Sequence, residues 1–321
     1  QGCASMQKGV VVLTGSSGEI IHNFRYSDAW ASAADGIGAS LVVTDPAAEL
    51  FRWSEAAQWR ASSRWGGSPG GVDPDANPSP LRISEVMFNP GDPDAGETAA
   101  GFNNNDDFEF IELANVGELP VDISGYSLAG AVDVVLGSYL LAPGEKVVVV
   151  KDRAAFIERY ATEDSVVGEY AGNLKNDSEE LFLLDPSGLI VLEFTYDEAW
   201  YESTDGGGRS LTIIDEHRHP VYWGVQQGWR PSGNPGGTPG LDADPYFTWV
   251  WSEFPYSLAM DPAQAGASID ADRDGLSNLV EYVLGTDPLS AGDRGYFQSV
   301  IEVGNELFLA LTYRLNAQDA L

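Results

Sequence analysis

Apolar and polar positions alternate with a period of two in the middle of the chain, and turn residues separate the alternating segments. This period is typical of β-strands that bury one face. The predicted strands are Leu81–Phe88, Phe108–Leu113, Pro120–Leu128, Lys146–Val150, Leu181–Leu184, Leu189–Tyr196 and Ser210–Ile214. Only Asp152–Tyr160 has helical spacing in this region. Several short strands joined by turns predict a mainly β fold built as an antiparallel sandwich.

The sequence contains an internal repeat with an offset of 170 residues. Residues 10–70 align without a gap on residues 180–240, with 22 identities in 61 positions. Tryptophans and the closing glycine-rich motif recur, and nothing in the chain matches residues 81–170 in the same way. We therefore expect the first copy to be the C-terminal part of a module whose N-terminal strands lie upstream.

Four segments follow from this pattern. They are a partial module at 1–75, a complete module at 81–240, a connector at 245–290 and the start of a further β domain at 291–321. The last segment is predicted because residues 296–315 alternate again. We expect the chain to begin and end inside domains.

The complete module resembles bacterial lamin-tail domains. Its opening Ile83-Ser-Glu-Val-Met-Phe-Asn-Pro90, the central Glu109-Phe-Ile-Glu-Leu113 and the closing Gly-Gly-Thr-Pro-Gly240 are similar to motifs of that family, as are Val121–Leu128 and Leu141–Glu145. The resemblance covers residues 81–240 and, in part, 1–70. It implies an immunoglobulin-like β-sandwich without catalytic activity, and a place in a large secreted or surface protein of a bacterium.

Composition and charge narrow the classes of partner. The chain has 17 Lys and Arg against 49 Asp and Glu, which gives a formal net charge of −32. Such a charge repels nucleic acid and anionic membranes, and no basic patch offsets it. The single cysteine excludes an intrachain disulfide, and no apolar run is long enough to span a bilayer. The expected partners are Ca²⁺, other surface proteins or extracellular polysaccharide; nothing in the sequence indicates the oligomeric state.

The sharpest chemical motif lies near the C-terminus. Asp270-Ala-Asp272-Arg-Asp274-Gly275 followed by Glu281 fits the D-x-[DN]-x-[DN]-G-x5-E calcium loop. Ca²⁺ prefers six to eight oxygen ligands, and alternate aspartates on a turning chain supply them. The predicted ligands are Asp270, Asp272, Asp274, the Leu276 carbonyl, Asn278 directly or through water, and Glu281 with both oxygens. Gly275 permits the sharp bend.

A helix is predicted directly after this loop, at Ser277–Leu284, ending at Gly285. Tyr246–Phe254 is the candidate entering helix, which would make an EF-hand-like unit. Loop, helix and the following Gly-Thr-Asp-Pro288 resemble bacterial thrombospondin type-3 repeats and dockerin-like segments. Because only one loop is present, we do not infer cohesin binding, and we expect Ca²⁺ to stiffen the connector.

Other polar and aromatic groups carry weaker signals. Glu109 and Glu112 could suggest acid–base chemistry, but three positions on a strand separate them onto opposite faces, so solvated or loop-tethering roles are favoured. The acidic connection 89–107 is predicted to be a mobile loop, with a second cation site as the alternative. The repeated tryptophans are expected to pack in cores or at edges. Trp249 and Trp251 would support carbohydrate binding only if they were exposed and coplanar.

The sequence therefore predicts a non-catalytic region of a secreted or cell-surface bacterial protein, serving adhesion, structural spacing or protein interaction. Two alternatives stay open: an accessory region of a secreted enzyme whose catalytic domain lies elsewhere, and a carbohydrate-binding module.

Overall fold

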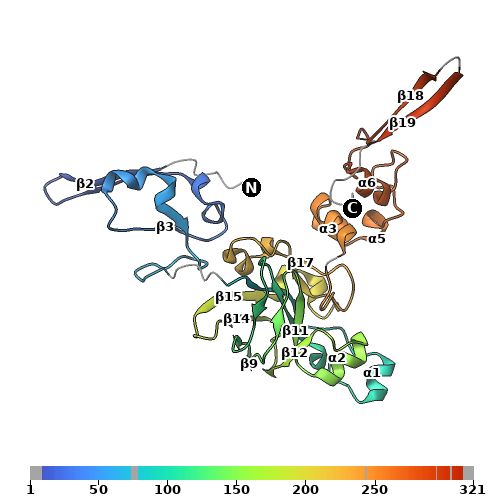
Figure 1. Cartoon of the computed structure of the whole chain (residues 1–321), viewed down its shortest axis with the longest axis horizontal. Helices are drawn as coiled ribbons and strands as arrows, with labels where there is room; N and C mark the ends of the chain where they lie inside the picture. Colours follow the sequence, from blue (N-terminus) through green and yellow to red (C-terminus); the bar gives the residue numbers. More distant parts are fainter. Residues whose placement is uncertain (1–8, 74–78, 243, 294, 304–305, 314–321) are drawn as a thin grey trace. The chain divides into compact units, whose positions relative to one another are not determined.

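The computed structural model describes residues 9–73, 79–242, 244–293, 295–303 and 306–313. The chain divides into two compact units, Gln1–Asp242 and Ala243–Leu321. Each unit is described by itself below (Figure 1). The described part is mainly β, as the alternating pattern predicts.

Two β-sheets form the central sandwich, which we define as residues 79–242. The six-stranded sheet has the order β12 (Val166–Glu169), β11 (Lys146–Val150), β6 (Phe110–Asn115), β5 (Leu81–Met87), β16 (Leu211–Ile213) and β17 (Trp229–Pro231). The five-stranded sheet has the order β13 (Ala171–Gly172), β9 (Val132–Val135), β8 (Ser127–Gly130), β14 (Ser178–Leu184) and β15 (Ile190–Asp197). A short pair joins β7 (Val121–Asp122) to β10 (Leu140–Leu141). All these described pairings are antiparallel except that of β11 with β12.

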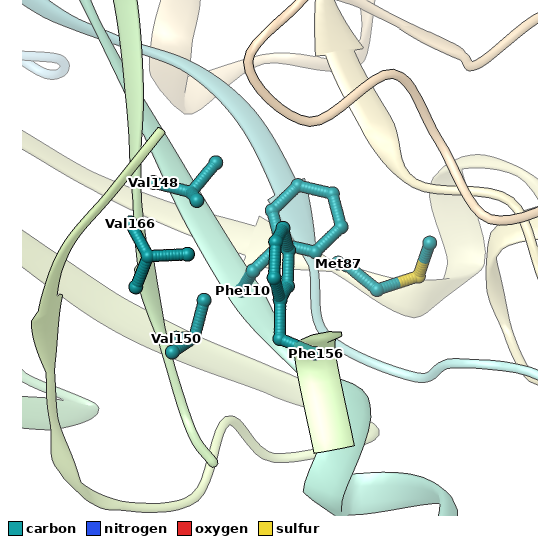
Figure 2. Close-up of a cluster of buried hydrophobic side chains, with 6 residues drawn as sticks. All are labelled: Met87, Phe110, Val148, Val150, Phe156 and Val166. Carbon is teal, nitrogen blue, oxygen red and sulfur yellow. The ribbon is translucent and has the colours of Figure 1, made fainter. Parts of the chain in front are cut away.

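The core of the central sandwich forms where apolar side chains of the strands meet a helix. One buried cluster, drawn in Figure 2, contains Met87, Phe110, Val148, Val150, Phe156 and Val166. Phe156 comes from α2 (Arg153–Tyr160), and its ring meets that of Phe110 edge-on at 6.2 Å. Helix α2 begins where predicted, because the Asp152 carboxylate accepts hydrogen bonds from the amides of Ala154 and Ala155.

The acidic connection 89–107 is folded, so the expectation of a mobile loop is wrong. It contains α1 (Ala95–Ala100) and the 3₁₀ helix η5 (Asn105–Phe108). The side chains of Asp94 and Glu97 form a reciprocal capping box at the start of α1. Glu97 also binds the Arg159 guanidinium of α2 through two contacts of 2.7 and 2.8 Å. This ion pair holds the connection against the sandwich.

Two strand predictions differ from the structure in detail, and several short strands were not predicted. The segment Pro120–Leu128 is not one strand, because residues 123–126 turn between β7 and β8. Strand β6 begins at Phe110, since η5 still includes Phe108. Strands β9, β10, β12, β13 and β17 were not predicted, because each has only two to four residues and carries no readable period.

The elements of residues 9–73 recur 170 positions later, as the repeat implies. Strands β1 (Gly9–Thr14), β2 (Ile20–Tyr26), β3 (Leu41–Val43) and β4 (Trp59–Ala61) correspond to β14, β15, β16 and β17. The 3₁₀ helices η1 (Asp28–Trp30), η2 (Ser32–Ala34), η3 (Leu50–Ser54) and η4 (Ala56–Gln58) correspond to η6 (Glu198–Trp200), η7 (Glu202–Thr204), η8 (Pro220–Gly224) and η9 (Gln226–Gly228). Similar sequence therefore folds into the same succession of elements twice.

The second unit combines short helices with a hairpin. It contains α3 (Pro245–Glu253), α4 (Tyr256–Ala259), α5 (Pro262–Ala265), α6 (Asn278–Leu284) and the paired strands β18 (Tyr296–Val303) and β19 (Glu306–Tyr313). The hairpin accounts for the alternation at 296–315. Of the predicted segments 1–75 and 291–321, residues 1–8, 74–75, 294, 304–305 and 314–321 lie outside the described residues. The four-segment division stays a prediction.

Candidate functional site

Three aspartates of the predicted calcium loop converge in the turn between α5 and α6. Asp270, Asp272 and Asp274 each offer a carboxylate oxygen, and these atoms lie within 4.8 Å of one another. In the part of the chain that the structure describes, this is the one cluster of at least three such side chains with that spacing. The backbone holds it, because the Asp274 amide donates to Oδ1 of Asp270 and of Asp272 at 3.1 Å.

Two residues of the loop adopt left-handed backbone conformations. Gly275 has φ +98°, as expected for the bend, and its amide donates to Asp270 Oδ2 at 2.9 Å. Arg273 has φ +65°, which the sequence did not indicate. A side chain at such a φ costs about 1 kcal/mol or more, so the surrounding contacts must hold the loop in place.

Glu281 lies in the first turn of α6 and is fully buried. Neither carboxylate oxygen has a hydrogen-bond partner; the Thr286 hydroxyl is near but makes no bond of standard geometry. Burial first, and then the negative charges of Asp272, Asp274 and Asp270, raise the pKa of Glu281 to about 7. A carboxylate buried among like charges is unfavourable unless a cation compensates it.

The other two predicted ligands, Leu276 and Asn278, follow the three aspartates in the sequence. The buried Asn278 donates through Nδ2 to the carbonyls of Gln264 (2.7 Å) and Gly266 (3.1 Å). Its Oδ1 has no hydrogen-bond partner. The Leu276 amide donates to Asp274 Oδ1 at 2.8 Å. The donor set consists of hard oxygens on a tight loop, which fits Ca²⁺ better than a soft metal.

The helix after the loop agrees with the prediction, but the helix before it does not. Helix α6 ends at Gly285, which has φ +63°. The segment Tyr246–Phe254 is helical, as α3, yet α4 and α5 separate it from the loop. The helix that directly precedes the loop is α5, with four residues. The prediction that Tyr246–Phe254 is the entering helix of an EF-hand-like unit is therefore wrong.

Helix α3 instead forms a small core with the elements around the loop. Val250 and Phe254 are buried with Ala259 and Ala265. The Tyr246 hydroxyl donates to the Ala265 carbonyl at 2.9 Å. Through this contact α3 is tied to the end of α5, close to the loop in sequence.

Trp249 and Trp251 do not form a flat, exposed pair. Both are half-buried against the small core of the second unit. Trp249 contacts the rings of Tyr246 and Tyr282, each at 5.6 Å. Trp251 contacts Phe247 and Tyr256. Their geometry opposes the carbohydrate-platform interpretation.

Glu109 and Glu112 of the central sandwich are buried, so a solvated role is wrong and the loop-tethering role is correct. Glu109 Oε2 accepts from the Tyr170 hydroxyl (2.9 Å) and the Leu174 amide (3.0 Å). Glu112 accepts from the Ser84 hydroxyl (2.7 Å) and the Gly240 amide (2.7 Å). The two carboxylates thus bind different loops and do not meet one substrate.

The sequence reasoning missed a third buried carboxylate, Glu85. Glu85 and Glu112 are register partners on β5 and β6. Lys146 Nζ lies 3.7 Å from Glu112 Oε1 and partly neutralises the pair. Burial, followed by the charge of Glu85, raises the pKa of Glu112 to about 8. Strand register, which the alternation alone does not give, decides that these two groups meet.

Comparison with known families matches residues 74–198 to the Lamin Tail Domain. This match covers less than half of the chain, and its described part, residues 79–198, belongs to the central sandwich. The match agrees with the immunoglobulin-like fold of that region. The Lamin Tail Domain is a non-enzymatic fold. No curated protein matches the chain significantly. Among the described residues, no helix is long and apolar enough to cross a membrane.

Proposed function

We propose that this chain is a non-catalytic region of a secreted or cell-surface bacterial protein, serving adhesion, structural spacing or protein interaction. The match to a non-enzymatic immunoglobulin-like domain supports this proposal. So do the buried carboxylates of the central sandwich, whose hydrogen bonds tether loops. The net charge of −32 favours cationic partners over nucleic acid or anionic lipid.

We further propose that residues 9–73 belong to a second lamin-tail module. The recurrence of every strand and 3₁₀ helix at an offset of 170 residues supports this assignment. We likewise propose that the segment 245–290 is a calcium-binding segment, because its loop resembles those of thrombospondin type-3 repeats and dockerin-like segments.

In this proposal Ca²⁺ binds the loop 270–281 and stiffens the connector. The observation that carries it is the buried Glu281, whose two oxygens have no hydrogen-bond partner beside three clustered aspartates. Asp270, Asp272 and Asp274 would supply carboxylate oxygens, and Glu281 would close the site. Leu276 and Asn278 would complete it through a carbonyl and an amide oxygen. The bound cation would relieve the repulsion among the four carboxylates.

Titration calorimetry of the full chain with CaCl₂, after removal of divalent ions, tests this site. Wild type is expected to bind Ca²⁺ with a saturable heat. Asp272→Asn keeps the side-chain shape and removes one charge, so it should weaken binding about tenfold or more. Glu281→Gln should weaken it similarly.

The matched control is Asp287→Asn, which removes the same charge from an exposed residue just beyond α6. Asp287 accepts a hydrogen bond from the Leu289 amide at 2.9 Å, and asparagine can keep that bond. The control should bind Ca²⁺ like wild type. Equal heats for wild type and Asp272→Asn would show that the loop does not bind calcium.

A further inference from the structure

Helix α3 precedes the calcium loop by many residues in the sequence but packs against the helix that follows the loop. Tyr282 of α6 meets the ring of Tyr246 edge-on at 5.7 Å and that of Trp249 at 5.6 Å. Tyr246 and Trp249, both in α3, also contact each other at 5.6 Å. We call these three residues the aromatic clasp. It joins α3 to α6 within the second unit (Figure 1).

The end of helix α5 ties the same two helices together. The Tyr246 hydroxyl of α3 donates to the Ala265 carbonyl at 2.9 Å. Asn278 is the first residue of α6, and its Nδ2 donates to the carbonyls on either side, those of Gln264 and Gly266. Three consecutive carbonyls therefore hold α3 and α6 at one place.

The aromatic clasp and the proposed calcium ligands share one turn of α6. Glu281 and Tyr282 are neighbours in this helix. Glu281 is fully buried near the three aspartates of the loop, and neither of its oxygens has a hydrogen-bond partner. Tyr282 contacts the two rings of α3. A movement of this turn therefore changes both sets of contacts at once.

The charges favour such a movement when no cation is bound. A buried carboxylate near three others is unfavourable without a compensating charge, and exposure to water relieves it. Exposing Glu281 requires its turn of α6 to leave the loop, and Tyr282 then leaves α3. A bound cation removes the repulsion with the carboxylates in place. Occupancy of the loop and docking of α3 are thus linked equilibria.

We propose that Ca²⁺ in the loop 270–281 closes the aromatic clasp, so that α3 docks on α6 when the ion is bound and is released when it is not. This inference rests on the calcium site proposed above and adds the means by which the ion stiffens residues 245–253. Tyr246, Trp249 and Tyr282 are positioning residues, since none of them is a proposed ligand. Helix α3 begins three residues after Asp242, the last residue of the first unit.

Hydrogen exchange of the full chain, followed by mass spectrometry of peptides from residues 245–253, tests this proposal. In the wild type, Ca²⁺ is expected to slow the exchange of the α3 amides about fivefold or more. Titration calorimetry of the same sample measures whether the ion binds. Exchange in β5 and β6 of the central sandwich is the internal reference and should not change.

The effect must also appear in the opposite direction, because coupling between two equilibria is reciprocal. Trp249→Leu removes the ring that contacts Tyr282 and should weaken calcium binding about three- to tenfold. Trp249→Phe keeps an aromatic ring and should restore most of the affinity. Tyr246→Phe keeps the ring but loses the hydroxyl that binds the Ala265 carbonyl, so it should weaken binding by a smaller factor.

The matched control is Trp251→Leu, which is the same substitution two positions further along α3. Trp251 contacts Phe247 of α3 at 6.3 Å and Tyr256 of α4 at 5.7 Å. The control should bind Ca²⁺ with nearly the affinity of the wild type. Circular dichroism verifies that each variant keeps its helices.

The possible results separate this inference from the calcium site on which it rests. Absence of calcium heat in the wild type would overturn the site, and the clasp with it. Saturable calcium heat with unchanged exchange of α3 would overturn the clasp alone. Equal calcium affinities for Trp249→Leu and Trp251→Leu would also overturn the clasp, because the ring contact with Tyr282 would then carry no coupling.

Discussion

Trp223→Ala is expected to lower the free energy of unfolding of the central sandwich by about 3–5 kcal/mol. Trp223 is fully buried, so truncation leaves a large cavity in a packed interior. The substitution also leaves the Ile83 carbonyl of β5 without the indole N–H that binds it at 2.7 Å. Chemical denaturation followed by far-ultraviolet circular dichroism measures the change.

Trp53→Ala is the matched control for this prediction, because Trp53 is the equivalent residue of the first copy. Its ring is only half-buried and its N–H has no partner. We expect this substitution to cost about 1 kcal/mol, far less than Trp223→Ala. A loss for Trp223→Ala as small as about 1 kcal/mol would mean that its packing contributes little to the sandwich, and equally large losses for both variants would contradict the expected difference between the two copies.

The alternation of apolar residues was sufficient to predict the long strands. β5 was found because it has a period of two, β11 because an apolar run follows a turn, and β14 and β15 because apolar segments flank a turn. The short elements β10, β13 and β17 were not found, since two or three residues carry no period. Helix α1 was missed for another reason: its residues are polar or small, and its start depends on the capping box between Asp94 and Glu97.

The candidate sites also differ in how far they could be predicted from the sequence. The calcium loop could be read from the sequence because its carboxylates lie within twelve consecutive residues. The meeting of Glu85 with Glu112 depends on strand register, and the ion pair of Glu97 with Arg159 joins residues 62 positions apart. Such contacts are set by the packing of whole elements, which local pattern does not specify.

Rising pH is expected to destabilise the central sandwich, chiefly through Glu109. This side chain is fully buried, and its Oε1 has no hydrogen-bond partner. Burial, opposed by the hydrogen bonds from Leu174 and Tyr170, raises the pKa of Glu109 to about 8. In the unfolded chain the pKa is the ordinary one, near 4.5. Between these two values the folded state holds a proton that the unfolded state has released.

The direction in which stability changes with pH follows from this difference between the folded and unfolded pKa of Glu109. The stabilisation is complete below the unfolded pKa and is lost as the pH rises through the folded pKa. Glu112, whose pKa is also raised to about 8, acts in the same direction. Glu109 alone should therefore lower the free energy of unfolding by about 3 kcal/mol from about pH 5 to about pH 8, and Glu112 should lower it by a similar amount. Denaturant titrations at several pH values measure this slope.

Glu109→Gln should remove roughly half of this fall, because glutamine cannot ionise and still accepts from Tyr170 and Leu174. At alkaline pH the variant should even be more stable than wild type, since no buried charge must form. Glu118→Gln, at an exposed glutamate, is the control and should leave the slope unchanged. A wild-type stability that rises from acid to alkaline pH would mean that Glu109 is ionised in the folded state, because the hydrogen bonds from Tyr170 and Leu174 would then outweigh its burial.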